Sequence, residues 1–235
     1  MSKKNLLLSL LSGFLLGLSF PPFHFGFLAW IFLVPLLIIF YQNNNPTEKV
    51  SAFYIAGFTS YAIITHWVAL NSGTTTQVAF LSYIAICIFY PFYWVIFVAI
   101  LDSLRRFKCS KNFQLILIPF IWVFLENLRD FGPLAAPWLN LPLSQTGYDR
   151  LIQVVSIHVD LSTLLIVFFN VLLYSFFNSK EKKYLYGFLL IFISNVLIGH
   201  ITIYNYNTSN FSKEIKVSIG QPVIYPDEKL SLIHI

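Results

Sequence analysis

Seven long apolar stretches separated by short polar loops occupy most of the chain up to residue 203. A helix needs about 20 apolar residues to cross a hydrocarbon core, and about 17 to 25 are tolerated. The stretches are continuously apolar, whereas the strands of a membrane barrel alternate lipid-facing and lumen-facing residues. We therefore predict an all-α polytopic membrane protein with about seven transmembrane helices. The predicted spans are residues 6–20, 25–41, 50–70, 78–101, 113–128, 153–177 and 184–203.

The composition supports the same class. Of the 235 residues, 57% are hydrophobic and only 11% are charged, and the mean hydropathy is +0.72. Soluble domains carry roughly a quarter charged residues. A water-soluble fold is therefore excluded.

The basic residues predict the orientation, because Lys and Arg favour the cytoplasmic loops. If seven spans alternate, ten basic residues fall on the side of the N-terminus and five on the other. The ten are Lys3, Lys4, Lys49, Arg105, Arg106, Lys108, Lys111, Lys180, Lys182 and Lys183. The five are Arg129, Arg150, Lys213, Lys216 and Lys229. This places the N-terminus in the cytoplasm and the C-terminal tail outside, and these dispersed charges give no reason to expect nucleic acid as a partner.

The first apolar stretch allows two interpretations. Lys3 and Lys4 followed by residues 6–20 have the order of a signal peptide. No small-residue cleavage site follows, and the sequence Phe20-Pro21-Pro22-Phe23 indicates a rigid turn. An uncleaved first helix fits better.

The cysteines offer no metal site and no evident nucleophile. Cys87 lies inside a predicted span and Cys109 in a predicted inner loop, and neither has the spacing of a metal site around it. The five histidines are equally dispersed. We predict no metal and no cofactor.

Glu126 and Arg129 are the most specific charged pair in the chain. They lie three residues apart and therefore share one helical face near the outer boundary. One interpretation is a salt bridge that lowers the cost of bringing both charges close to lipid. The other is that the pair positions a polar headgroup or an outer domain.

Two tryptophans and an amide complete the candidate residues. Trp138 and Gln145 lie in a proline-bent stretch, residues 137–145, on the outer side, and Trp67 ends the third predicted span. Tryptophan at a membrane interface is commonly only an anchor. The alternative is that these residues line or support a substrate cleft.

The C-terminal tail has a different pattern. Residues 215–219 alternate apolar and polar side chains as a half-buried strand does. One strand has no partner for its backbone groups and cannot form a domain. We predict a transmembrane domain at 1–203, a linker and the first strand of a truncated domain at 204–229, and an artefactual tail at 230–235, with natural truncation as the alternative. Sequencing the gene across codon 229 would decide between the two.

Several segments together carry a family resemblance. They are residues 18–23 with 28–37, His66-Trp67-Val68, the run from Trp122 through Glu126 to Arg129, Pro137-Trp138-Leu139 with Ser144-Gln145 and residues 151–153, and residues 215–229. In this order they resemble the apolipoprotein N-acyltransferase family, in which a membrane region precedes a nitrilase-like α/β domain.

The resemblance implies an acyltransferase of the bacterial cytoplasmic (inner) membrane. Its donor is a membrane phospholipid and its acceptor is a diacylated apolipoprotein, and we expect a monomer. A cysteine takes the acyl chain as a thioester and passes it to the amine of a diacylglyceryl-cysteine, assisted by Glu and Lys. No residue of this chain matches that catalytic set, so we expect the chain to be inactive alone. The cleft candidates are Trp67, Glu126, Arg129, Trp138 and Gln145.

Two alternatives belong to other classes. A non-enzymatic seven-helix scaffold or transporter subunit would show converging polar residues at mid-membrane or two matching halves. A lipid-linked glycosyltransferase would need acidic residues in the first outer loop, and residues 20–24 contain none. The sequence shows neither pattern.

Overall fold

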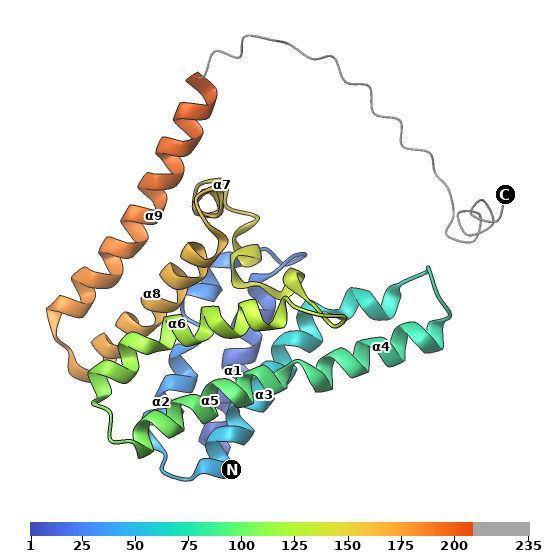
Figure 1. Cartoon of the computed structure of the whole chain (residues 1–235), viewed down its shortest axis with the longest axis horizontal. Coiled ribbons are helices and arrows are strands. Elements are labelled where there is room, and N and C mark those ends of the chain that lie inside the picture. The colour runs from blue at the N-terminus through green and yellow to red at the C-terminus, as the bar shows by residue number, and fades with distance from the viewer. Residues whose placement is uncertain (209–235) are drawn as a thin grey trace.

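The computed structural model describes residues 1–208, and every regular element within them is a helix (Figure 1). The α-helices are α1 Lys3–Ser19, α2 Val34–Gln42, α3 Pro46–Ile64, α4 Thr76–Phe89, α5 Pro91–Arg106, α6 Lys111–Arg129, α7 Asp149–Ile152, α8 Val159–Ser179 and α9 Lys182–Thr208. The 3₁₀ helices are η1 Gly26–Trp30, η2 His66–Leu70, η3 Pro137–Leu139, η4 Leu141–Gln145 and η5 Gln153–Ser156. The strand predicted at 215–219 and the tail 230–235 lie outside the described residues.

Within residues 1–208, three helices are long and apolar enough to cross a membrane. They are Thr76–Arg106, in which α4 and α5 join, Val159–Ser179 and Lys182–Tyr206. Helical structure also occurs within each of the other four predicted ranges, and the total of seven spans stays a prediction.

The structure differs from the predicted ranges at four places. The helix of the sixth predicted span, α8, begins at Val159 and not at residue 153. His158 leaves the helical conformation, and its ring nitrogen accepts a hydrogen bond from the Asp160 backbone N–H. In the third predicted span, α3 ends at Ile64, and the 3₁₀ helix η2 follows it. The second predicted span is divided into the 3₁₀ helix η1 and the α-helix α2. The last helix continues to Thr208, through residues predicted as linker.

The break between η1 and α2 is stabilised by one side chain from α8. The Asn170 carboxamide oxygen accepts from the Leu33 backbone N–H at 2.9 Å, and its nitrogen donates to the Ala29 carbonyl at 3.0 Å. Asn170 is completely buried. Backbone groups inside a membrane need partners within the protein, so Asn170 allows the second stretch to leave regular helix.

Helix α1 packs closely against α3. A Cβ added at Gly13 would lie 2.6 Å from Thr59 Cβ, and one at Gly17 would lie 2.7 Å from Ile63 Cδ1. Small residues four positions apart let two membrane helices approach closely. The Gly13-x-x-x-Gly17 spacing therefore fixes how α1 packs.

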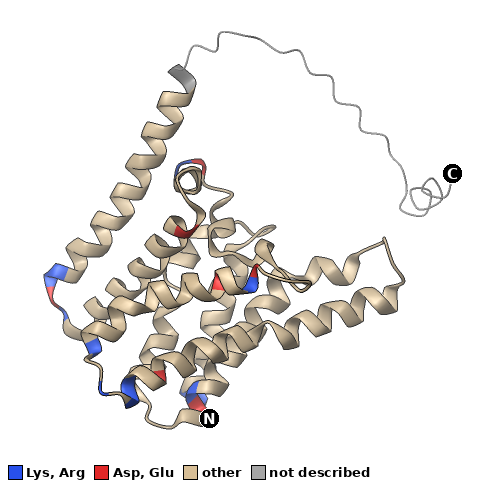
Figure 2. Cartoon of the chain, in the orientation of Figure 1, with Lys and Arg blue, Asp and Glu red and all other residues tan. Residues whose placement is uncertain are grey.

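Charged residues are divided between the two ends of the helical bundle. Lysines and arginines of the loops gather at the end that contains the N-terminus, whereas few lie at the opposite end (Figure 2). At the lysine-rich end Lys49 and Asp102 form an ion pair, which Arg106 joins at 3.1 Å. This asymmetry is the one that the positive-inside rule uses.

Candidate functional site

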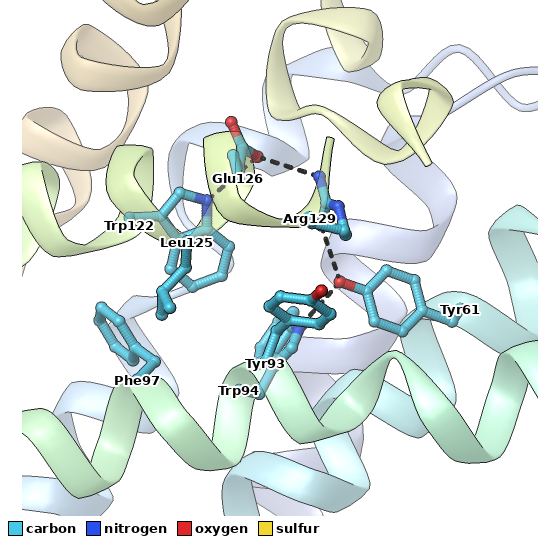
Figure 3. A pocket seen from close by; sticks show the side chains of 8 residues that line it. All are labelled: Tyr61, Tyr93, Trp94, Phe97, Trp122, Leu125, Glu126 and Arg129. Carbon is cyan, nitrogen blue, oxygen red and sulfur yellow. Dashed lines mark hydrogen bonds and ion pairs between the residues drawn. The ribbon is translucent and has the colours of Figure 1, made fainter. Parts of the chain in front are cut away.

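The C-terminal end of α6 carries a buried ion pair. Glu126 and Arg129 occupy one helical face as predicted, and the Arg129 Nη2 to Glu126 Oε1 distance is 3.9 Å (Figure 3). Both residues are buried, with exposed fractions of 7% and 4%. Because each charge removed from water needs partners, their hydrogen bonds decide what the pair can do.

Glu126 joins three parts of the structure. Its Oε1 accepts from the Trp122 ring N–H at 3.2 Å and from the Leu141 backbone N–H at 2.9 Å, and its Oε2 accepts from the Thr163 hydroxyl at 2.7 Å. The carboxylate thus connects α6, α8 and η4. Its acceptor positions are occupied by protein groups, so its role is to hold the loop.

Arg129 extends the network in two directions. Its Nη1 donates to the Tyr61 hydroxyl at 3.1 Å and its Nη2 to the Asn140 carboxamide oxygen at 2.5 Å. The Tyr61 hydroxyl also accepts from the Trp94 ring N–H at 3.1 Å, and the Asn140 nitrogen donates to Asp130 at 2.6 Å. The guanidinium therefore links α3 with the loop that follows α6.

An aromatic pocket lies directly beside this network (Figure 3). Its cavity volume is about 20 Å³. The Trp94 and Trp122 rings meet edge to face, with centroids 5.2 Å apart. The residues that line it are Tyr61, Tyr93, Trp94, Phe97, Trp122, Leu125, Glu126 and Arg129.

Gln145 is a second anchor of the same loop. It is fully buried; its oxygen accepts from the Trp30 ring N–H at 3.0 Å and its nitrogen donates to the Gly26 carbonyl at 3.0 Å. A Cβ at Gly26 would overlap the Ser144 carbonyl oxygen. The loop is therefore held tightly against η1. Gln145 is part of this buried contact and is not exposed at the surface of the site.

Trp67 and Trp138 have the opposite environment. Their exposed fractions are 51% and 44%, and both line an apolar pocket of about 230 Å³. We call this pocket the tryptophan hollow. Its lining residues are Phe20, Pro21, Ile64, Trp67, Trp138, Leu143 and Thr146. It lies where the ends of α1 and α3 meet the η3–η4 loop.

The five sequence candidates thus fall into two groups. Trp67 and Trp138 line the tryptophan hollow, whereas Glu126, Arg129 and Gln145 are buried and anchor its loop. The sequence candidates did not include several members of the hydrogen-bond network, namely Tyr61, Trp94, Asp130, Asn140 and Thr163. Asn140 was detectable as an amide within the proline-bent stretch, but Tyr61 and Thr163 have no distinguishing local pattern.

The cysteines and the possible metal ligands of the described residues bear on the chemistry of the site. Cys87 is buried within α4, and Cys109 lies in the loop between α5 and α6, at the lysine-rich end. Within residues 1–208 no three His, Cys, Asp or Glu side chains group as a metal site would require. The arrangement can bind an apolar group and hold a loop in place.

Comparisons with known proteins agree on one family. A family profile described as "Apolipoprotein N-acyltransferase N-terminal domain" matches residues 12–172. The chain is 29% identical to the apolipoprotein N-acyltransferase of Geobacter metallireducens over 66% of this chain and 30% of that protein. It is 29% identical to that of Chlorobaculum tepidum over 96% and 43%, and 28% identical to that of Thermotoga maritima over 84% and 41%. The chain therefore spans less than half the length of these curated relatives.

Proposed function

Because this chain belongs to the apolipoprotein N-acyltransferase family, we propose that it forms the membrane region of an enzyme that acylates bacterial lipoproteins. The donor is a membrane phospholipid, and the acceptor is the N-terminal diacylglyceryl-cysteine of an apolipoprotein. The match of the family's N-terminal domain to residues 12–172 is the observation that carries this proposal.

The tryptophan hollow supports a role in substrate binding. A phospholipid and a diacylated lipoprotein both present acyl chains, and the lining of the hollow is almost wholly apolar. Tryptophan rings are suited to the membrane interface, where one side of the ring meets acyl chains and the other meets headgroups. We propose that Trp67 and Trp138 form part of the cleft wall, with Glu126, Arg129 and Gln145 supporting it.

The reacting groups do not belong to the described residues in this proposal. A thiolate would attack the donor's ester carbonyl to form a thioester and release a lysophospholipid, and the acceptor's amine would then displace the thiolate to form an amide. Cys87 is buried within α4, and Cys109 lies in the loop between α5 and α6, at the lysine-rich end. We propose neither of them as the reacting thiol.

We place the protein in the bacterial cytoplasmic (inner) membrane as a multi-pass monomer. The N-terminus faces the cytoplasm, which puts the lysine-rich end inside and the tryptophan hollow outside. The charge asymmetry of Figure 2 supports this orientation.

A chimera tests the proposal. Residues 1–208 would replace the matching part of the Chlorobaculum tepidum relative, and the hybrid would be expressed in bacteria depleted of their own N-acyltransferase. We expect the N-terminal peptide of a lipoprotein to gain the mass of one acyl chain, as measured by mass spectrometry.

The chimera needs a check that it folds. Size-exclusion chromatography in detergent should show one symmetrical peak for the hybrid. A hybrid that folds by this criterion but leaves the lipoproteins diacylated would contradict the proposal and favour a non-enzymatic scaffold.

A further inference from the structure

We propose that Arg129 is a positioning residue that sets the separation between the two walls of the tryptophan hollow. The inference deepens the proposed function, because it assigns the geometry of the same cleft to one buried guanidinium. It rests on the hydrogen bonds that this group makes on each side.

The hollow has two walls that are distant in sequence. One wall is the end of α3 with η2 and contributes Ile64 and Trp67, and the other is the η3–η4 loop and contributes Trp138 and Leu143. The helices α4, α5 and α6 lie between the two walls in the sequence. The chain connection therefore does not fix the distance between the walls.

Arg129 makes one hydrogen bond to each wall, in both cases to a residue close in sequence to a lining residue. Tyr61, which accepts from Nη1, lies three residues before Ile64 on the same helix. Asn140, which accepts from Nη2, lies two residues after Trp138. One rigid planar group thus joins the supports of both tryptophans.

The other polar groups keep this guanidinium in one orientation. Glu126 provides the opposite charge at 3.9 Å. Asp130 fixes the carboxamide of Asn140 by accepting from its nitrogen. Trp94 donates to the same Tyr61 hydroxyl that Arg129 bonds. Each acceptor of Arg129 is therefore itself held by a second partner.

Lysine cannot reproduce this geometry. An ammonium is a compact charge on a flexible stem, whereas the guanidinium presents several N–H donors in a fixed plane. Arg129→Lys therefore keeps the charge near Glu126 but loses the rigid two-sided connection. It is the variant that separates positioning from charge.

The first test measures the gap directly and needs no activity. Spin labels would be placed at Trp67→Cys and Trp138→Cys in the full chain with Cys87→Ser and Cys109→Ser. Dipolar broadening of the spectrum reports the distance between the labels. We expect a narrow distribution with Arg129 and a broader one with Arg129→Lys or Tyr61→Phe.

A matched control comes from the opposite end of the bundle. Arg106 is a largely exposed arginine that pairs with Asp102, and Arg106→Lys should leave the distribution unchanged. A distribution that is the same for Arg129 and Arg129→Lys, in protein that elutes as one symmetrical peak, would overturn the inference.

The second test uses the chimera. Loss of one hydrogen bond of about 0.5 to 1.5 kcal/mol corresponds to roughly a twofold to tenfold change. Arg129→Lys should raise KM for the phospholipid donor by about that factor with little change in kcat. A fall in kcat alone, as from a smaller folded fraction, would contradict positioning. A chimera without any activity would refute the proposed function, and the spin-label result would still decide the role of Arg129.

Discussion

The carboxylate of Glu126 on α6 accepts the backbone N–H of Leu141 at 2.9 Å, so a helix side chain holds the main chain of the loop that carries Trp138. Buried backbone N–H groups require a partner. Leu141 is the first residue of η4, where the backbone N–H has no partner within the helix. Here the partner is a carboxylate that Thr163 also fixes from α8.

Removal of this carboxylate should be costly. Glu126→Ala leaves Arg129 buried without its opposite charge, which typically costs about 3 to 5 kcal/mol. Glu126→Gln keeps an acceptor for Leu141 and should cost less. Thermal unfolding in detergent checks both variants.

The control for this experiment is Glu181, which is half exposed and paired only with Lys183. Glu181→Ala should change the free energy of unfolding by less than about 1 kcal/mol, as exposed ion pairs do. An equally small effect for Glu126→Ala would show that the loop is held by other contacts.

Asn170 gives a second stability prediction. Asn170→Leu removes the partners of the Leu33 N–H and the Ala29 carbonyl, and each orphaned buried group costs about 1 to 3 kcal/mol. Ser175→Ala on the same helix is the matched control, since the Ser175 hydroxyl bonds only to its own helix at Val171. Similar unfolding temperatures for the two variants would argue against the role assigned to Asn170.

Glu48 predicts a pH dependence at the lysine-rich end. Hydrogen bonds from Asn43, at 2.5 Å, and from Asn5, at 3.0 Å, lower the pKa of this partly buried carboxyl below its ordinary value. A lowered folded-state pKa means that the stabilisation is fully present above the pKa of an unfolded glutamate, about 4.3. It is lost as the pH falls through the lowered value.

The measurement is the unfolding temperature between neutral pH and pH 3. The difference between the native chain and Glu48→Gln should shrink as the solution becomes more acidic. A difference that is constant across this range would show that the ionised carboxylate is not the stabilising form.

The two cysteines should be dispensable. In the active chimera, Cys87→Ala with Cys109→Ala should leave the rate of acyl transfer within about twofold, because the proposal assigns the reacting group to neither thiol. Loss of acyl transfer with normal folding would assign a reacting group to this part of the chain.

The sequence predicted the class and the family but only part of the site. Continuous apolar runs indicated helices, and the resemblance built on Trp67, the Glu126–Arg129 run and the Trp138 loop is confirmed by the family match. Spacing also placed Glu126 and Arg129 on one face. These features are local, so they can be recognised from neighbouring residues.

The rest depends on contacts between distant segments. Nothing in the sequence links Arg129 to Tyr61, which lies 68 residues earlier, or Asn170 to Leu33, which lies 137 residues earlier. The start of α8 at Val159 was also missed, because the apolar pattern continues through Gln153–Ser156 although the backbone there is a separate 3₁₀ turn. The hydropathy of a segment shows how apolar it is, but it does not show where the backbone leaves the α-helical conformation.

The central claim is that the tryptophan hollow receives an acyl chain of the substrate. The most direct measurement is the steady-state dependence of acyl transfer on phospholipid concentration in the chimera, with Trp67→Ala, Trp138→Ala and the exposed control Phe131→Ala. The account predicts that both tryptophan variants lose most of kcat/KM for the donor while Phe131→Ala keeps it. Unchanged kcat/KM in both tryptophan variants, with normal insertion and folding, would contradict the claim and reduce Trp67 and Trp138 to interface anchors.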